Sequence, residues 1–249
     1  MIHKMEMKTG NKEIIMEFFD EESGQSINFQ IPEAYKRVAV NCSGGADSSI
    51  LLLLTAHYLK ETGRENDVKL SVLTCSNDLK GRWNGRKAAD VIDYVIRKTG
   101  YTNFDMHYTY YRDTQDEKYF HMVESELFSQ KRVDFIASGI TSNPPEGVMV
   151  EKANGEIRDM WEGRLPDRDG TIKTELNVSG IMAFYMPFTN VDKRMVASLY
   201  KQLDAEDLLD RTRSCEAIPD AGNYDENFDK EPCGKCWWCC ERKWAFGKF

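Results

Sequence analysis

The sequence contains no long hydrophobic run, and no apolar stretch approaches the roughly 20 residues needed to span a bilayer. Residues 1–18 mix charged with apolar residues and lack the apolar core of a secretion signal. These two absences predict a cytoplasmic protein without a membrane partner.

The sequence also lacks an excess of positive charge. Its net charge is −8, and no segment is dense in Lys or Arg. Direct nucleic-acid binding is therefore not expected, because such proteins usually carry a basic patch or stripe. The chain has four histidines, and none of them can be paired with a nucleophile into a Ser-His-Asp or Cys-His arrangement.

What is present is typical of a globular protein: 41% of the residues are apolar and 30% are charged. The 249 residues fit one α/β domain with an appendage. Strand and helix patterns alternate along the chain. The predicted strands are 37–40, 68–75, 104–111, 133–139 and 183–188, and the predicted helices are 48–62, 85–100, 117–131 and 191–203. This alternation predicts a Rossmann-like α/β fold, with a parallel sheet covered by helices on both faces.

Three other segments flank or interrupt this pattern. We expect residues 1–35 to form an N-terminal hairpin extension, 36–212 the α/β domain, 141–180 an irregular insertion within it, and 213–249 a cysteine-rich tail. The insertion carries basic residues that either close over an anionic substrate or form a solvated charged loop. They are Lys152, Arg158, Arg164, Arg168 and Lys173.

A glycine-rich loop separates the first predicted strand of the domain from its helix, in the stretch VNCSGGADSSILLLL (40–54). Glycines let backbone N–H groups approach a ligand closely, and a helix N-terminus favours a bound anion. In an open α/β sheet such a loop lies where ligands bind, so it predicts a phosphate site. No Gly-Lys-Ser/Thr follows the glycines, which excludes a Walker A loop. Asp47 either caps the following helix or holds Mg²⁺.

Five of the seven cysteines fall within the last 35 residues. Cys233, Cys236 and Cys239 recur every three residues, with Cys215 upstream and Cys240 to spare. Four thiolates around one ion form a common structural zinc site, which predicts Zn²⁺ here. An iron–sulfur cluster stays an open alternative, because C-x₂-C-x₂-C also begins a ferredoxin-type motif. The tail's three tryptophans are expected to pack it onto the domain. They are Trp237, Trp238 and Trp244.

The stretch SGGADS (43–48) resembles the SGGxDS loop of the PP-loop ATP pyrophosphatases. The resemblance implies an adenine-nucleotide-hydrolase-like fold that binds ATP and releases pyrophosphate while adenylating a substrate. It implies that the triphosphate is held by Ser43, Gly44, Gly45, Asp47 and Ser48, of which Asp47 and Ser48 are expected to be catalytic. By fold analogy, Cys75 after the second strand and Gly139 after the fourth would lie at the nucleotide. Cys42 and Cys75 are also predicted to be small buried hydrophobes.

The tail resembles the zinc site of the 7-cyano-7-deazaguanine synthase family (QueC), whose pattern is Ser-Cys, a spacer, and CGxCxxCxxRxxAF. That family makes the nitrile from 7-carboxy-7-deazaguanine with ammonia and ATP, on the route to modified guanine. The resemblance implies zinc at Cys215, Cys233, Cys236 and Cys239, and a catalytic role for Lys193 in its matching helix.

The middle of the chain departs from that family at residues 75–88 and 139–147. The ATP and zinc sites therefore carry over, whereas the substrate does not. Four residues there could stack on or hydrogen-bond a purine edge: Asn77, Asp78, Trp83 and Asn143.

Together with these patterns, the resemblance implies an ATP-dependent carbon–nitrogen ligase that uses Mg²⁺, contains Zn²⁺, and acts on a deazapurine carboxylate or amide with ammonia. A PP-loop tRNA thiolation enzyme and a non-catalytic nucleotide-binding protein are the alternatives. Whether the protein is a homodimer stays open.

Overall fold

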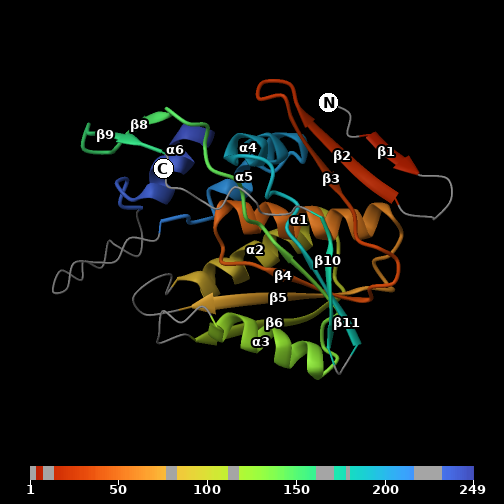
Figure 1. The fold of residues 1–249 in the computed structure, drawn as a ribbon. Coiled ribbons are helices and arrows are strands. Elements are labelled where there is room, and N and C mark those ends of the chain that lie inside the picture. Colours follow the sequence, from red (N-terminus) through yellow and green to blue (C-terminus); the bar gives the residue numbers. More distant parts are fainter. Residues whose placement is uncertain are drawn as a thin grey trace.

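A computed structural model of the chain describes residues 4–7, 14–76, 83–111, 118–160, 171–177, 180–215 and 232–249. A six-stranded sheet lies at its centre, in the order β10-β11-β7-β4-β5-β6 (Figure 1). Its strands are β4 (Arg37–Asn41), β5 (Lys69–Ser76), β6 (Phe104–Tyr111), β7 (Phe135–Ser138), β10 (Lys173–Asn177) and β11 (Gly180–Tyr185).

The sheet is parallel except at one edge, where β10 pairs antiparallel with β11. The prediction of an irregular insertion at 141–180 is therefore wrong in part. The segment contains β10 and a separate hairpin of β8 (Met149–Glu151) and β9 (Ile157–Asp159). These strands are three to five residues long and are rich in charge, so their pairing with a neighbour, rather than their own hydrophobic pattern, defines them.

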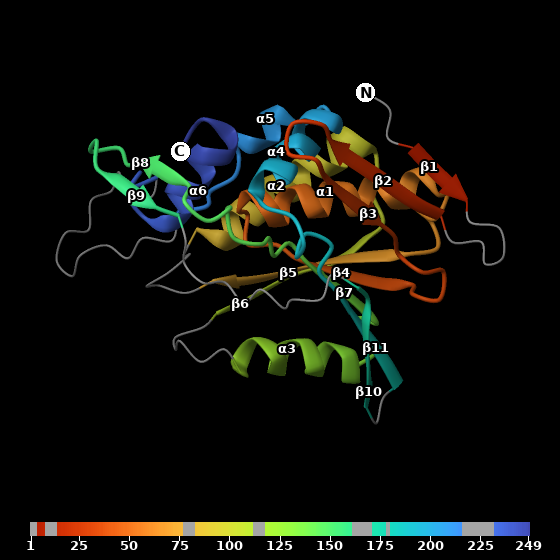
Figure 2. The ribbon, with the colours of Figure 1, turned by 45° about the horizontal axis from the view of Figure 1, so that its top comes forward.

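Helices cover both faces of the sheet, as predicted. Figure 2 shows α1 (Ala46–Glu61), α2 (Asn84–Thr99), α4 (Lys193–Gln202) and α5 (Glu206–Leu209) on one face and α3 (Lys118–Ser129) on the other. Side chains of β4 alternate between these layers: Val38 and Val40 join the core on the α1 side, and Ala39 joins the core beneath α3.

The N-terminal segment forms an antiparallel sheet of β1 (Lys4–Met7), β2 (Ile14–Asp20) and β3 (Gln25–Phe29). The predicted hairpin is present as β2 and β3, and β1 is an additional strand. Met16 and Phe18 are buried in the same core as the domain helices. This sheet therefore packs directly onto the α/β domain.

Helix α6 (Trp237–Phe246) ends the chain and packs beside the β8–β9 hairpin (Figure 1). Trp237 is 3% exposed, and its indole N–H donates to the Met160 carbonyl at 3.2 Å. Trp238 meets Trp237 edge to face, and Trp244 lies beneath the Arg194 guanidinium. The tryptophans therefore attach the tail to the domain, as predicted. Among the helices in the described part of the chain, none is both long and apolar enough to cross a membrane.

Candidate functional site

The glycine loop lies at the point where the strand order reverses. From β4 the chain passes outward through β5 and β6, and then returns to place β7 on the other side of β4. The loops that follow β4 and β7 therefore border a crevice at the carboxyl ends of both strands. In open α/β sheets this is the position at which ligands bind.

The conformation of the loop requires glycine at position 44. Gly44 has φ +75°, and a Cβ there would lie 2.4 Å from the Cβ of Lys87. Hydroxyl groups then close the loop on itself. Ser48 Oγ accepts from the Ser43 N–H and donates to the Gly45 carbonyl, both at 3.2 Å, while Ser43 Oγ accepts from the Gly45 N–H at 3.3 Å.

Helix α1 begins at Ala46, two residues before the predicted start, and Asp47 lies in its first turn. The N-cap is Gly45, without a side-chain cap, so the interpretation of Asp47 as the helix cap is wrong. Gly139 follows β7 and packs against this first turn, because a Cβ there would lie 2.9 Å from the Asp47 carbonyl carbon and oxygen. In the structure Gly139 thus allows a close approach of backbone to backbone.

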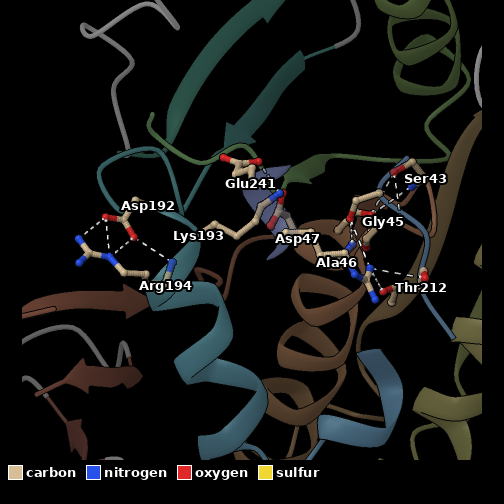
Figure 3. A network of polar contacts seen from close by, with 12 residues as sticks. Ser43, Gly45, Ala46, Asp47, Asp192, Lys193, Arg194, Thr212 and Glu241 are labelled. Carbon is tan, nitrogen blue, oxygen red and sulfur yellow. Dashed lines mark hydrogen bonds and ion pairs between the residues drawn. The ribbon is translucent and has the colours of Figure 1, made fainter. Parts of the chain in front are cut away.

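Asp47 belongs to a buried ion triad (Figure 3). The Lys193 ammonium lies 3.0 Å from Asp47 Oδ2 and 2.7 Å from Glu241 Oε2. The side chains of Lys193 and Glu241 are 2% and 0% exposed, whereas that of Asp47 is 21% exposed. The sequence predicts Asp47 and Lys193 as site residues but not Glu241, since a lone glutamate among cysteines forms no motif. The triad joins the glycine loop, α4 and the cysteine tail.

Lys193 is the first residue of α4, and the neighbouring residues fix this helix start. Asp192 caps the helix by accepting from the Arg194 N–H at 2.8 Å. Gln25 of the N-terminal sheet bonds Asp192 twice, from its amide nitrogen to Oδ2 and from the Asp192 N–H to its amide oxygen, each at 2.8 Å. The N-terminal sheet thereby helps to position Lys193.

Residues 212–215 run from the tail past the glycine loop. The Arg213 N–H donates to the Gly44 carbonyl at 2.9 Å. Arg242 of α6 is buried and supports this segment, with Nη1 donating to Thr212 Oγ1 and Nη2 to the Leu209 carbonyl, both at 2.7 Å. Burial lowers the pKa of Arg242. The loop and the cysteine tail are therefore connected by hydrogen bonds as well as by the ion triad.

Two further residues that the sequence places near the nucleotide, Cys75 and Trp83, contact other parts of the chain. Cys75 is half-buried near the end of β5, where its carbonyl accepts from Asn84 Nδ2 at 2.9 Å. Trp83 is buried, with the Arg213 guanidinium 4.0 Å from its ring centre, so the ring has a packing role. Cys42 is fully buried, and burial raises the pKa of its thiol, which confirms the prediction of a small hydrophobe.

Several of the suggested residues lie outside the described part of the chain. These are Asn77, Asp78, Arg164 and Arg168.

The structure brings Cys215, Cys233, Cys236 and Cys239 together, with all four sulfurs within 4.8 Å of one another. Sγ of Cys233 and Cys239 are 3.9 Å apart. Four sulfurs bound tetrahedrally to one zinc at about 2.3 Å are about 3.8 Å apart, so the donor set fits a single ion. A four-iron cluster attaches each thiolate to a different iron and requires wider spacing.

The four thiols also interact electrostatically. Hydrogen bonds from Cys215, Cys236 and Cys239 hold the pKa of Cys233 well below its ordinary value. Backbone N–H groups of Lys235 and Cys236 donate to Cys233 Sγ at 3.4 and 3.3 Å. Such donors favour the thiolate, which is the form that binds metals.

We expect one metal ion per chain, and Cys239→Ser should lose it because a sulfur inside the cluster is removed. Cys240→Ser is the matched control, since Cys240 Sγ faces the Lys235 carbonyl at 3.8 Å and is not one of the four clustered sulfurs. The measurement is metal content by elemental analysis. Loss of the metal in Cys240→Ser together with retention in Cys239→Ser would contradict the assignment of the fourth ligand.

The fold and the site define an open α/β sheet protein with a glycine-rich loop at its switch point and a four-cysteine cluster that could bind a metal. The sequence matches no protein-family model, and no curated protein matches it. The chain is similar to several solved structures, at sequence identities of 13–16%.

One similar structure is the U34-tRNA thiolase NcsA from Methanococcus maripaludis with its 4Fe–4S cluster, at 13% identity and a TM-score of 0.43. The match covers 78% of this chain and 62% of the thiolase, so the chain spans less than two thirds of it. NMN synthetase from Francisella tularensis matches at 16% identity and a TM-score of 0.37, over 86% of this chain and 79% of the synthetase.

FMN adenylyltransferase from Candida glabrata, in complex with FMN and the ATP analog AMPCPP, matches at 16% identity and a TM-score of 0.40. That match covers 66% of this chain and 47% of the adenylyltransferase. At such low similarity, none of the three carries its activity over to this chain.

Proposed function

We propose that the protein is an ATP-dependent adenylating enzyme that releases AMP and pyrophosphate. The observation that carries the proposal is the SGGADS loop at the switch point of the sheet. Asp47 of this loop lies in the first turn of α1 and pairs with the buried Lys193 ammonium. A glycine loop followed by a helix N-terminus provides N–H donors and a positive dipole for a polyphosphate. The amides and hydroxyls of Ser43, Gly44, Gly45 and Ser48 would hold the ATP phosphates in exchange for the hydrogen bonds that close the loop on itself.

The reaction begins when a carboxylate oxygen of the substrate attacks the α-phosphorus of ATP in line. The bond from this phosphorus to the bridging oxygen breaks, and pyrophosphate leaves with its electrons. Ammonia then attacks the activated carbonyl carbon, loses a proton, and expels AMP to form an amide. The protein contributes by orienting the reactants and by offsetting charge on the phosphates.

Lys193 is a positioning residue that affects the reaction by orienting Asp47. Its ammonium is 2% exposed and lies between two carboxylates, so it orients Asp47 instead of contacting the substrate. Asp47 has a second oxygen, Oδ1, for which the described residues supply no hydrogen-bond partner. A carboxylate oxygen of this kind suits Mg²⁺, which binds through one or two carboxylates together with substrate phosphates. When bound, Mg²⁺ would offset phosphate charge.

The cysteine cluster would hold zinc in a structural role. Four cysteines fill a tetrahedral shell and leave no open position for substrate. Because Cys215 directly follows the segment that bonds the glycine loop, the ion would stabilise the loop through residues 212–215. Metal binding of this kind contributes to folding free energy.

For the substrate we propose a 7-substituted 7-deazaguanine, whose 7-carboxylate is adenylated first and whose 7-amide is adenylated in a second round. In the second round the activated amide loses AMP and a proton to give the nitrile. The support is the occurrence in one chain of the glycine loop, the Lys193 helix and the CGxCxxCxxRxxAF tail. A free base also suits a chain whose net charge is −8 better than tRNA does.

The test is to incubate the metal-loaded protein with ATP, Mg²⁺ and ammonium, with and without 7-carboxy-7-deazaguanine or 7-amido-7-deazaguanine. We expect AMP and nitrile to form only when a base is present, as followed by mass spectrometry. If neither base binds by calorimetry and neither base stimulates AMP formation, the deazaguanine proposal is wrong.

Thiolation of a nucleic-acid base is a second candidate. It is favoured by one observation: Cys215 and Cys239 line a pocket that adjoins the glycine loop, which brings sulfur near the proposed nucleotide site. Iron with a brown absorption band, and sulfur transfer in place of nitrile formation, would favour this candidate over the ligase.

A further inference from the structure

A pocket lies between the glycine loop and the cysteine cluster. Its cavity volume is ≈ 180 Å³, and its walls include Lys87, Arg213, Cys215, Cys239 and Arg242. It adjoins the loop at two places. Lys87 lies against Gly44, and the Arg213 N–H bonds the Gly44 carbonyl.

The pocket gathers positive charge. The side chains that line it include four cations, Lys87, Arg213, Arg242 and Lys248. The acidic groups among them are the Asp210 carboxylate, which pairs with Lys248, and the thiols of Cys215 and Cys239. Burial lowers the pKa of Lys87, the Asp90 carboxylate opposes this change, and the neighbouring arginines lower the pKa further. Cations crowded in this way repel one another unless an anion lies between them.

Neutral groups contact two of these cations. Arg242 donates to the Thr212 hydroxyl and the Leu209 carbonyl, and Arg213 stacks over the Trp83 ring. The N-terminal end of α1 adds to the positive field, since the Ala46 N–H points to Ser214 Oγ, another lining residue, at 3.4 Å. Fixed guanidinium groups are well suited to phosphate recognition.

The size of the pocket limits what it can hold. Pockets that bury a whole drug-sized ligand are usually about 300–1,000 Å³. A cavity of ≈ 180 Å³ therefore suits a small anionic group better than a complete nucleotide.

We propose that this pocket binds a small multivalent oxyanion, a phosphate or pyrophosphate group, through Lys87, Arg213 and Arg242. The inference rests on the proposed function only for the source of the anion, which would be the pyrophosphate end of ATP. A phosphate carried by a second ligand has the same chemistry.

The experiment is calorimetric titration of the metal-loaded protein with inorganic pyrophosphate at fixed ionic strength. Lys87→Gln should raise the pyrophosphate Kd about tenfold or more, because a charge-assisted hydrogen bond is lost. Arg97→Gln is the matched control, since it removes one charge from an exposed position on the same helix. Lys87→Arg should restore binding.

Absence of pyrophosphate binding, or equal Kd values in the wild type, Lys87→Gln and Arg97→Gln, would overturn the proposal and leave the cations to offset metal-bound thiolates. A second titration, with a non-hydrolysable ATP analogue at saturation, identifies the source. Loss of pyrophosphate binding then assigns the pocket to ATP, and retained binding assigns it to a second phosphate-bearing ligand. Both results support an oxyanion site.

The two proposals can fail separately. If no AMP forms but Lys87→Gln still weakens pyrophosphate binding, adenylation is wrong and the oxyanion pocket stands. If AMP forms but Lys87→Gln leaves the pyrophosphate Kd unchanged, the oxyanion pocket is wrong and adenylation stands.

Discussion

Replacing Asp47 with asparagine should lower the rate of AMP formation by about 100-fold or more while the protein stays folded. The substitution keeps the shape of the side chain but removes the charge that pairs with Lys193 and would hold Mg²⁺. Loss of one preorganised electrostatic group typically costs about 10²–10³ in kcat. The measurement is steady-state AMP release with circular dichroism on the same sample.

Glu61→Gln is the matched control for Asp47→Asn. Glu61 is exposed at the opposite end of α1, so its substitution removes a carboxylate from the same helix without touching the loop. Unchanged AMP formation in a folded Asp47→Asn protein would show that Asp47 has no part in the reaction.

Lys193→Met should lower the free energy of unfolding by about 3–5 kcal/mol, the usual cost of leaving a buried charge without its partner. Glu241 is fully buried and lies 2.7 Å from the Lys193 ammonium, so the substitution removes a cation that offsets its buried charge. Lys201→Met, an exposed change at the end of the same helix, should have little effect. Denaturant unfolding of the metal-loaded proteins gives both values.

The double variant Lys193→Met/Glu241→Gln measures the coupling energy between Lys193 and Glu241. Removing the carboxylate should recover part of the lost stability, because the double variant no longer buries the charge that Lys193 offsets at position 241. Additive losses in the double variant would mean that the two residues do not stabilise each other.

Much of the fold could be predicted because each layer leaves a hydrophobic signal in the sequence. The run Ile50–Leu54 is buried throughout, and it follows a β-branched strand and a glycine loop, which fixes the strand-loop-helix order. Strand β10 could not be predicted, since KTELN has little hydrophobic pattern of its own and is defined by pairing with β11. The predicted start of α1 lies two residues after the observed one because Ala46 and Asp47 belong to a loop-like stretch of the sequence.

The candidate site was only partly predictable for a different reason. Ser43 to Ser48 and the four cysteines are local motifs, and a motif is visible in a single sequence. Glu241 meets Lys193 only after the tail folds back, and Arg213 reaches Gly44 in the same way. Arg213 contributes positive charge to the pocket and supports the loop, and Glu241 pairs with Lys193. No local spacing in the sequence predicts either contact.

The central claim is that a substrate oxygen attacks the α-phosphorus of ATP, and isotope transfer tests it most directly. The metal-loaded protein would be incubated with ATP, Mg²⁺, ammonium and 7-carboxy-7-deazaguanine labelled with ¹⁸O in both carboxylate oxygens. Mass spectrometry of the products should then find one ¹⁸O in AMP and none in pyrophosphate. Unlabelled AMP, or ADP and phosphate as the main products, would contradict adenylation of the carboxylate.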